Sequence, residues 1–171
     1  MYYEVYIASK AGFRAFDLDG LTYRCIVPRI DAGVETFEDG VRATDMERTV
    51  LDSINDFWKV SMDLEETLRC IYLIPGLDCR KLLSYLDSYN DGFLFQKTGY
   101  VLEHFREEFQ LPGEFFDELR KRIPNGKRCF YKCIKRECHS ENHKYNRDWR
   151  LFVPDDLLWI TRKGVDYEAQ I

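Results

Sequence analysis

The hydrophobic pattern of this chain changes its period near residue 45. Before that point, "YYEVYIAS" and "LTYRCIVPR" alternate apolar and polar residues, which is typical of β-strands. After it, apolar residues recur at the i, i+3, i+4 spacing of a helix: Met46, Val50, Leu51, Ile54, Phe57 and Trp58. Near the end, "KRCFYKCI" and "DWRLFVP" return to the strand pattern. Strands, then helices, then strands predict an α+β fold and not alternating βαβ units.

Turn residues place the individual elements. We expect a small antiparallel sheet from Tyr2 to Arg42, because "DLDG" (17–20) and "EDG" (38–40) are suited to tight hairpin turns. A run of about five helices follows, each bounded by capping residues or by Pro-Gly and Asp-Gly pairs. They are expected to begin at Asp45 and then to cover residues 64–73, 79–89 (capped by Asp78), 93–109 and 114–123. A closing strand pair then flanks a polar loop from Arg136 to Arg147.

Composition favours one domain with a substantial core. With 171 residues, 45% of them apolar and 15% aromatic, we expect a single α+β domain over residues 1–171. No apolar run approaches the roughly 18–20 residues of a membrane span. The N-terminus lacks the basic lead and apolar stretch of a signal peptide. We therefore expect a cytoplasmic protein without membrane contact, whose six cysteines are reduced thiols.

Charge is distributed unevenly along the chain. The net charge is −5, yet residues 120–150 hold eleven Lys and Arg against three acids, so the rest of the chain is strongly acidic. The candidate partner or nucleic-acid surface consists of Lys127, Arg128, Lys132, Lys135, Arg136, Arg147 and Arg150. Aromatic residues are interleaved with these cations, as they are in nucleic-acid surfaces. Three interpretations stay open: nucleic-acid contact, docking of an acidic protein, or a solvated basic rim whose aromatic residues belong to the core.

The segment "RATDMERTVLDSINDF" gathers acids and an arginine at the expected start of the first helix. Thr44 followed by Glu47 predicts a capping box, and Arg48 with Asp52 predicts an i, i+4 ion pair on the exposed face. Glu47 also projects into the apolar arc of the helix, so it either bends back to the cap or is partly buried beside a cation such as Arg42. A buried carboxylate of this kind is a candidate general base. Because no partner for a mechanism lies nearby in the sequence, we favour the structural interpretation.

A second cluster, "CFYKCIKRECHSENH", contains good zinc ligands. The candidates are Cys129, Cys133, Cys138, His139 and His143, spaced C-x3-C-x4-CH-x3-H. If the segment forms a strand, however, residues 129 and 133 lie about 13 Å apart, which is too far to hold one ion. We therefore predict a strand and a loop, without a metal.

Motifs of common enzyme classes are missing from the sequence. No Asp or Glu is followed two residues later by Lys, as metal-dependent nucleases of the restriction type require. The three histidines do not form a recognisable nucleophile motif, and no glycine-rich phosphate loop occurs. We predict no catalytic residues, no cofactor and no enzymatic activity. A small nucleic-acid-binding module, dependent on zinc or on the basic segment, remains an alternative.

Several segments resemble a family of antitoxins. "TDMERTVLDSI" is similar to the s-D-x-E-R-T-l-l-D-a motif of AbiEi-type antitoxins, which belong to abortive-infection (type IV) toxin–antitoxin systems. "YEVYIASKAGFRAF", "LDCRKLLSYLDSY", "QKTGYVLE" and "DWRLFVPDDL" resemble further segments of the family's C-terminal domain, in the same order. The resemblance runs from Tyr2 to about Leu158. Lys97-Thr98 departs from the family's Arg-Leu in the "qRLGyLLE" signature.

The resemblance implies an antitoxin and transcriptional regulator in phage defence, acting by binding. The functional partner it implies is a nucleotidyltransferase-like toxin, with or without direct contact. Family members usually bind operator DNA through an N-terminal winged helix, for which we find no pattern here. We therefore expect DNA to be bound through an N-terminal domain that is absent from this chain.

Overall fold

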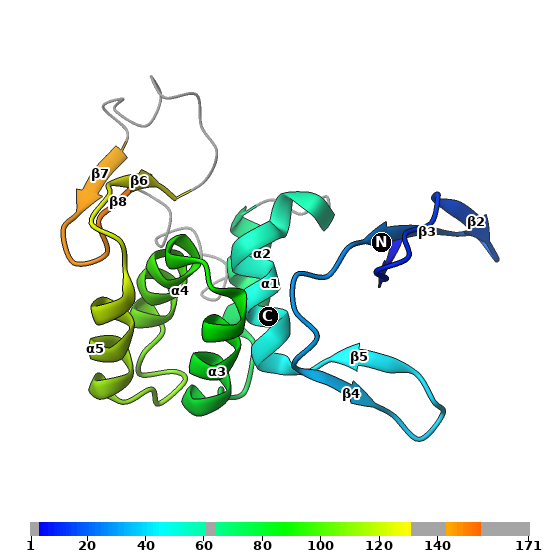
Figure 1. Ribbon diagram of the computed structural model, residues 1–171, viewed down its shortest axis with the longest axis horizontal. Helices are drawn as coiled ribbons and strands as arrows, with labels where there is room; N and C mark the ends of the chain where they lie inside the picture. Colours follow the sequence, from blue (N-terminus) through cyan, green and yellow to red (C-terminus); the bar gives the residue numbers. More distant parts are fainter. Residues whose placement is uncertain (1–3, 61–63, 131–142, 155–171) are drawn as a thin grey trace, which may run out of the picture.

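The computed structural model describes residues 4–60, 64–130 and 143–154 (Figure 1). A strand-rich region comes first, five α-helices follow, and a small sheet closes the described part of the chain. The predicted α+β class and the order of its parts are therefore confirmed.

The first strands form two separate sheets. They are β1 (Glu4–Ala8), β2 (Phe16–Leu18), β3 (Leu21–Ile26), β4 (Val34–Thr36) and β5 (Arg42–Thr44). Two antiparallel hairpins, β2–β3 and β4–β5, form at the predicted turns. β1 instead lies parallel to β3, so the expectation of one antiparallel sheet is wrong here. The turn signals specify only which strands pair across a short loop. β2 occupies one edge of β3, and β1 pairs with the other edge, where it runs in the same direction as β3.

Five helices form the body of the molecule. They are α1 (Met46–Asp56), α2 (Leu64–Tyr72), α3 (Cys79–Tyr89), α4 (Gly92–His104) and α5 (Gly113–Arg122), with a 3-10 turn over Phe57–Val60 after α1. α1 contacts α3 and α4, and α4 contacts α5, so that α4 lies between α1 and α5 (Figure 1). Their apolar faces share one core, which includes Leu51, Leu86 and Leu102. α4 ends at His104, earlier than predicted, because Phe105 leaves the helical conformation.

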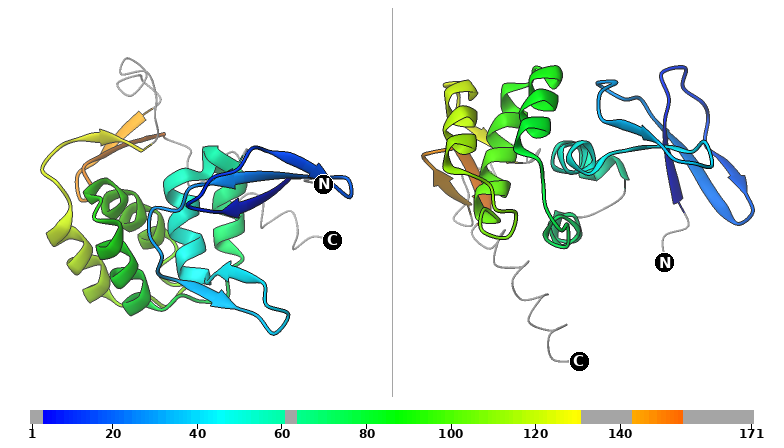
Figure 2. Two further views of the ribbon diagram at one scale, coloured as in Figure 1. Left: turned by 45° about the vertical axis from the view of Figure 1, so that its right-hand side comes forward. Right: turned by 90° about the horizontal axis from the view of Figure 1, so that it is seen from below.

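The closing sheet has three strands, where a pair was predicted. They are β6 (Arg128–Cys129), β7 (His143–Asn146) and β8 (Leu151–Pro154), in the order β6–β8–β7. β7 lies within the segment that was predicted to be a loop. Cys129 is disulfide-bonded, so the expectation that all six cysteines are thiols is wrong at this position. Figure 2 shows this sheet on one side of the helices and strands β1–β5 on the other.

Candidate functional site

The first helix is capped by Asp45, one residue later than predicted. Asp45 has an extended backbone, and its carboxylate accepts a hydrogen bond from the Arg48 amide at 2.9 Å. Thr44 belongs to β5, where it pairs with Val34, and its hydroxyl lies 2.7 Å from the Thr49 hydroxyl. The predicted Thr44–Glu47 capping box is therefore wrong, because pairing with β4 fixes Thr44 one position before the helix.

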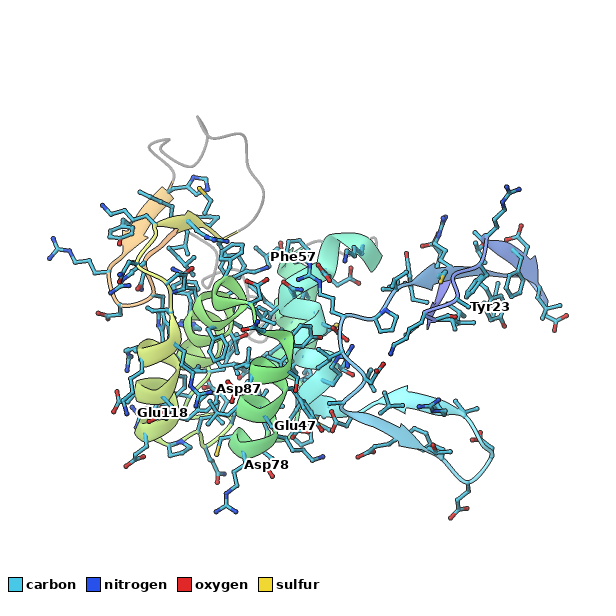
Figure 3. All side chains as sticks on the ribbon, in the orientation of Figure 1. Tyr23, Glu47, Phe57, Asp78, Asp87 and Glu118 are labelled. Atoms are coloured by element: carbon cyan, nitrogen blue, oxygen red, sulfur yellow. The ribbon has the colours of Figure 1, made fainter. Side chains whose placement is uncertain are left out.

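Glu47 reaches across to another helix instead of back to its own cap. Its carboxylate accepts a hydrogen bond from the Asp78 amide at 2.8 Å, and Lys81 Nζ lies 3.6 Å away. Glu47 and Asp78 lie at neighbouring ends of α1 and α3 in Figure 3. Of the two alternatives for Glu47, the structure shows the buried carboxylate beside a cation, and this cation is Lys81 and not Arg42. Both partners are some thirty residues away in the sequence, so no local pattern could identify them.

Arg48 forms the predicted ion pair, but it does so inside the molecule. Its Nε donates to Asp52 at 2.8 Å, yet only 2% of the residue is exposed. The guanidinium also donates to the carbonyls of Ile30 (3.1 Å) and Ala32 (2.7 Å), in the segment that leads from β3 to β4. The expected exposed position is therefore wrong. Arg48 joins the strand-rich region to α1.

The carboxylate of Asp45, at the junction of β5 and α1, accepts several hydrogen bonds. Asp45 accepts from the Tyr85 hydroxyl at 2.7 Å and from Lys81 at 3.2 Å. Burial alone would raise the pKa of Asp45, but hydrogen bonds from Tyr85, the Arg48 amide and Lys81 bring this pKa below its ordinary value. The Tyr85 pKa rises to about 12, chiefly because Tyr85 donates to Asp45. A carboxylate with a lowered pKa is a weak base, so Asp45 is poorly suited to general base catalysis.

The "QKTGYVLE" segment of α4 holds the closing sheet in place through Trp149. Gln96 donates to the Trp149 carbonyl at 3.0 Å, and the indole N–H donates to Glu103 at 2.6 Å. A Cβ on Gly99 would lie 2.1 Å from the indole ring, so only glycine leaves room for it. Arg120 hydrogen-bonds Glu103 and lies 4.9 Å from the same ring. Two segments that carry the family resemblance, in α4 and before β8, are thus packed against each other.

Lys97 is a buried cation that the sequence patterns did not reveal. It is 1% exposed, and its ammonium donates to the carbonyls of Ile54 (3.3 Å) and Asn55 (3.1 Å) at the end of α1. The Phe93 ring centroid lies 4.8 Å from Nζ. Burial lowers the pKa of Lys97 to about 8. The negative end of the helix dipole favours a cation here, which gives Lys97 a structural role.

The predicted basic residues that the structure describes gather at one end of the closing sheet. Lys127, Arg128 and Arg147 are exposed, and Arg150 is half-buried. The amide of Arg128 donates to the Arg150 carbonyl at 3.1 Å, which brings the start of β6 beside the β7–β8 turn. We name these four residues the basic surface. Lys132, Lys135 and Arg136 lie outside the described residues.

Aromatic rings support part of the basic surface. Lys127 Nζ lies 4.7 Å from the Tyr145 ring centroid, and the Arg128 guanidinium lies 5.2 Å from that of Phe93. Arg150 instead donates to the Pro124 carbonyl (2.9 Å) and the Asn125 side chain (2.8 Å), so it mainly fixes the loop before β6. Phe130 and Trp149 are buried in the core, as the solvated-rim interpretation expects for the aromatic residues.

Other cations of the same segment are neutralised locally. Arg120 pairs with Glu103, Lys121 with Glu118 at 2.6 Å, and Arg122 with Asp87. Figure 3 labels Glu118 and Asp87 on α5 and α3. Within the described ranges, the four residues of the basic surface form no salt bridge with a carboxylate. The available positive charge therefore lies on the sheet and not on α5.

The zinc hypothesis concerns residues that are mostly outside the described ranges. Of the five candidate ligands, only Cys129 and His143 are described, and the sulfur of Cys129 is engaged in a disulfide. The described residues contain no group of three or more His, Cys, Asp or Glu that could hold a metal ion. Across the same ranges, every helix is too short or too polar to cross a membrane. Comparisons with protein families, curated proteins and solved structures find no match for this chain.

Proposed function

We propose that this chain is a cytoplasmic, non-enzymatic antitoxin and regulator domain of an AbiEi-like toxin–antitoxin system, which acts through binding at the basic surface. The basis for the family is the sequence resemblance. Its functional partner under this proposal is a nucleotidyltransferase-like toxin. The basic surface is the structural observation on which the binding role depends.

Charge and rigidity together support a binding role for this surface. Lys127, Arg128 and Arg147 are exposed on a chain whose net charge is −5, so they concentrate positive potential at one end. The sheet beneath them is fixed to α4 by the buried Trp149 and its bonds to Gln96 and Glu103. A surface held by the core presents its charges with little loss of conformational entropy when a partner binds.

An alternative function is direct binding of nucleic acid. The contact between Lys127 and the Tyr145 ring favours it, because phosphate-binding cations beside aromatic rings are typical of single-strand binding surfaces. Salt dependence separates the two functions. Nucleic-acid affinity falls steeply with salt through counterion release, whereas salt mainly slows the association of two proteins.

The test is a double charge reversal, Lys127→Glu with Arg147→Glu, compared with Arg14→Glu and Arg80→Glu as a control. All four side chains are exposed, and the two variants change the net charge equally. Only the first variant should lose toxin neutralisation in cells. If nucleic acid is the ligand, its salt slope in fluorescence anisotropy should also fall by about two. Equal behaviour of the two variants in both assays, with unchanged thermal melts, would contradict the proposal.

A further inference from the structure

The β4–β5 hairpin carries apolar side chains that nothing in the described part of the chain covers. Val34, Phe37 and Val41 are 39%, 55% and 56% exposed. The hairpin is a sheet of two short strands, and Figures 1 and 2 show it projecting from the helices. Isolated two-stranded hairpins are only marginally stable in water, so this one gains stability if another surface packs on it.

One face of the hairpin is both apolar and acidic. Glu35 pairs with Ala43, and the Phe37 amide donates to the Val41 carbonyl at 2.8 Å, which continues the ladder. Because side chains alternate along a strand, these four residues share a face. Glu38 and Asp39 add two exposed carboxylates at the turn, against Arg42 in β5 and Lys81 of α3, whose Nζ lies 3.9 Å from the Glu35 carboxylate. A partner surface that fits this face carries cations and also aromatic or aliphatic side chains.

The closing sheet of the same chain has this complementary chemistry. It exposes Lys127, Arg128 and Arg147. Beside them lie the half-buried rings of Tyr145 and Phe152, whose centroids are 5.0 Å apart. The hairpin and the sheet lie at opposite ends of the molecule, with helices between them (Figure 1). Within one chain the two surfaces are therefore kept apart, and a second copy can bring them together.

We propose that two copies of this chain associate reciprocally, with the acidic hairpin of each copy docked on the basic surface of the other. Two-fold symmetry makes each contact occur twice, so two small contacts act together. The inference goes beyond the proposed function and does not depend on it. Since the surface is shared, an anionic partner would compete with self-association.

The association is measured by sedimentation velocity of the full chain, from about 1 to 200 µM. We expect a dimer at low salt whose dissociation constant rises with ionic strength. The hairpin variant combines Glu35→Lys with Glu38→Lys, and the sheet variant combines Lys127→Glu with Arg147→Glu. Each variant alone should raise the dissociation constant about tenfold or more, because like charges then face each other.

A mixture of the two variants gives the decisive result. The lysines of the hairpin variant then face the glutamates of the sheet variant, while the unchanged acidic hairpin faces the unchanged basic surface. An equimolar mixture should therefore recover the dimer that neither variant forms alone. The matched control is Glu107→Lys with Glu108→Lys, two exposed acids that form no salt bridge within the described residues and that change the charge as the hairpin variant does. This control should dimerise like the wild type.

A monomer at every concentration, a dimer insensitive to salt, or a mixture that stays monomeric would overturn the proposal. An equal loss of dimer in the Glu107 and Glu108 control would also overturn it, since net charge alone would then explain the effect. The result is separate from the proposed function, because no toxin or nucleic acid is present. The hairpin variant leaves the basic surface intact, so its toxin neutralisation should persist even when its self-association is lost.

Discussion

Residues 4–44 and the helical body differ in how they are stabilised. The body shares a continuous core, which runs from Val50 in α1 to Val153 in β8. Among residues 4–44 not one is buried, although the region contains five strands. Strand pairing and surface side-chain contacts, such as the stacked rings of Phe16 and Tyr23, hold its two sheets without buried residues. Its attachment to the body includes polar contacts around Arg48 and ion pairs of Arg29. Regular secondary structure and a stabilising core are therefore separate properties, since the strands form here without buried side chains.

The largest loss of stability is expected from a change at Gly99, inside the helical body. Gly99→Val should lower the free energy of unfolding by about 3 kcal/mol, because its Cβ would overlap the buried Trp149 ring. Gly40→Val is the matched change in the β4–β5 turn. Its φ of +82° is unfavourable for valine, yet its Cβ meets open space. Urea unfolding should show a smaller loss for Gly40→Val, and an equal loss would break the distinction between the two regions.

The second test removes the attachment at Arg48. Arg48→Met should lower the free energy of unfolding by about 2–3 kcal/mol, because the carbonyls of Ile30 and Ala32 lose their charged donor. Hydrogen exchange should accelerate in residues 30–44 more than in α4. Arg80→Met, an exposed change on α3, is the control and should alter neither quantity. Uniform acceleration over the whole chain would mean that the two regions unfold as one unit.

A third test uses the titration of Lys97 within the core. Its folded pKa of about 8 lies below the ordinary 10.5, so between these values the unfolded chain binds more protons than the folded one. Stability attributable to Lys97 should therefore rise as the pH increases from 8 towards 10, by about 2 kcal/mol. The difference between the wild type and Lys97→Met, measured by urea unfolding at each pH, isolates this contribution from the tyrosines. If the difference in unfolding free energy between the two proteins does not change with pH, the Lys97 ammonium is exposed to water and not buried.

The smallest effects concern the start of α1, where the two regions meet. Asp45→Ala should cost about 1–2 kcal/mol, because the helix loses its cap and Tyr85 loses its acceptor. Since the pKa of Asp45 is lowered in the folded state, this contribution should be lost as the pH falls through the folded pKa. Thr44→Ala should cost less than Asp45→Ala in thermal melts. A larger loss of stability for Thr44→Ala than for Asp45→Ala would indicate that Thr44 is the helix cap.

Local signals predicted some elements well and failed at others for a physical reason. The bounds of α3 and its cap at Asp78 were predicted correctly, because capping and periodicity are encoded within a few residues. The choice between Thr44 and Asp45 depended on pairing with β4, which periodicity does not encode. The burial of Arg48 and Lys97 depended on carbonyls distant in the sequence, and charged residues are rarely fully buried. At the basic surface, residue type predicted Lys127 and Arg147 as exposed, but the engagement of Arg150 with the Pro124 loop came from tertiary structure.

The attachment at Arg48 has a consequence for synthesis on the ribosome. Residues 4–44 emerge before the helices, but contacts that hold them come later in the chain, from Arg48 and, through Asp45, from Tyr85. Until α3 has left the exit tunnel, the strands have neither a core of their own nor a surface on which to settle. Their exposed edges and apolar side chains are then accessible to other nascent chains and to chaperones. Residues 4–44 are made before the helices but are attached only after the helices have been made, and the delay is set by the number of residues between β1 and α3.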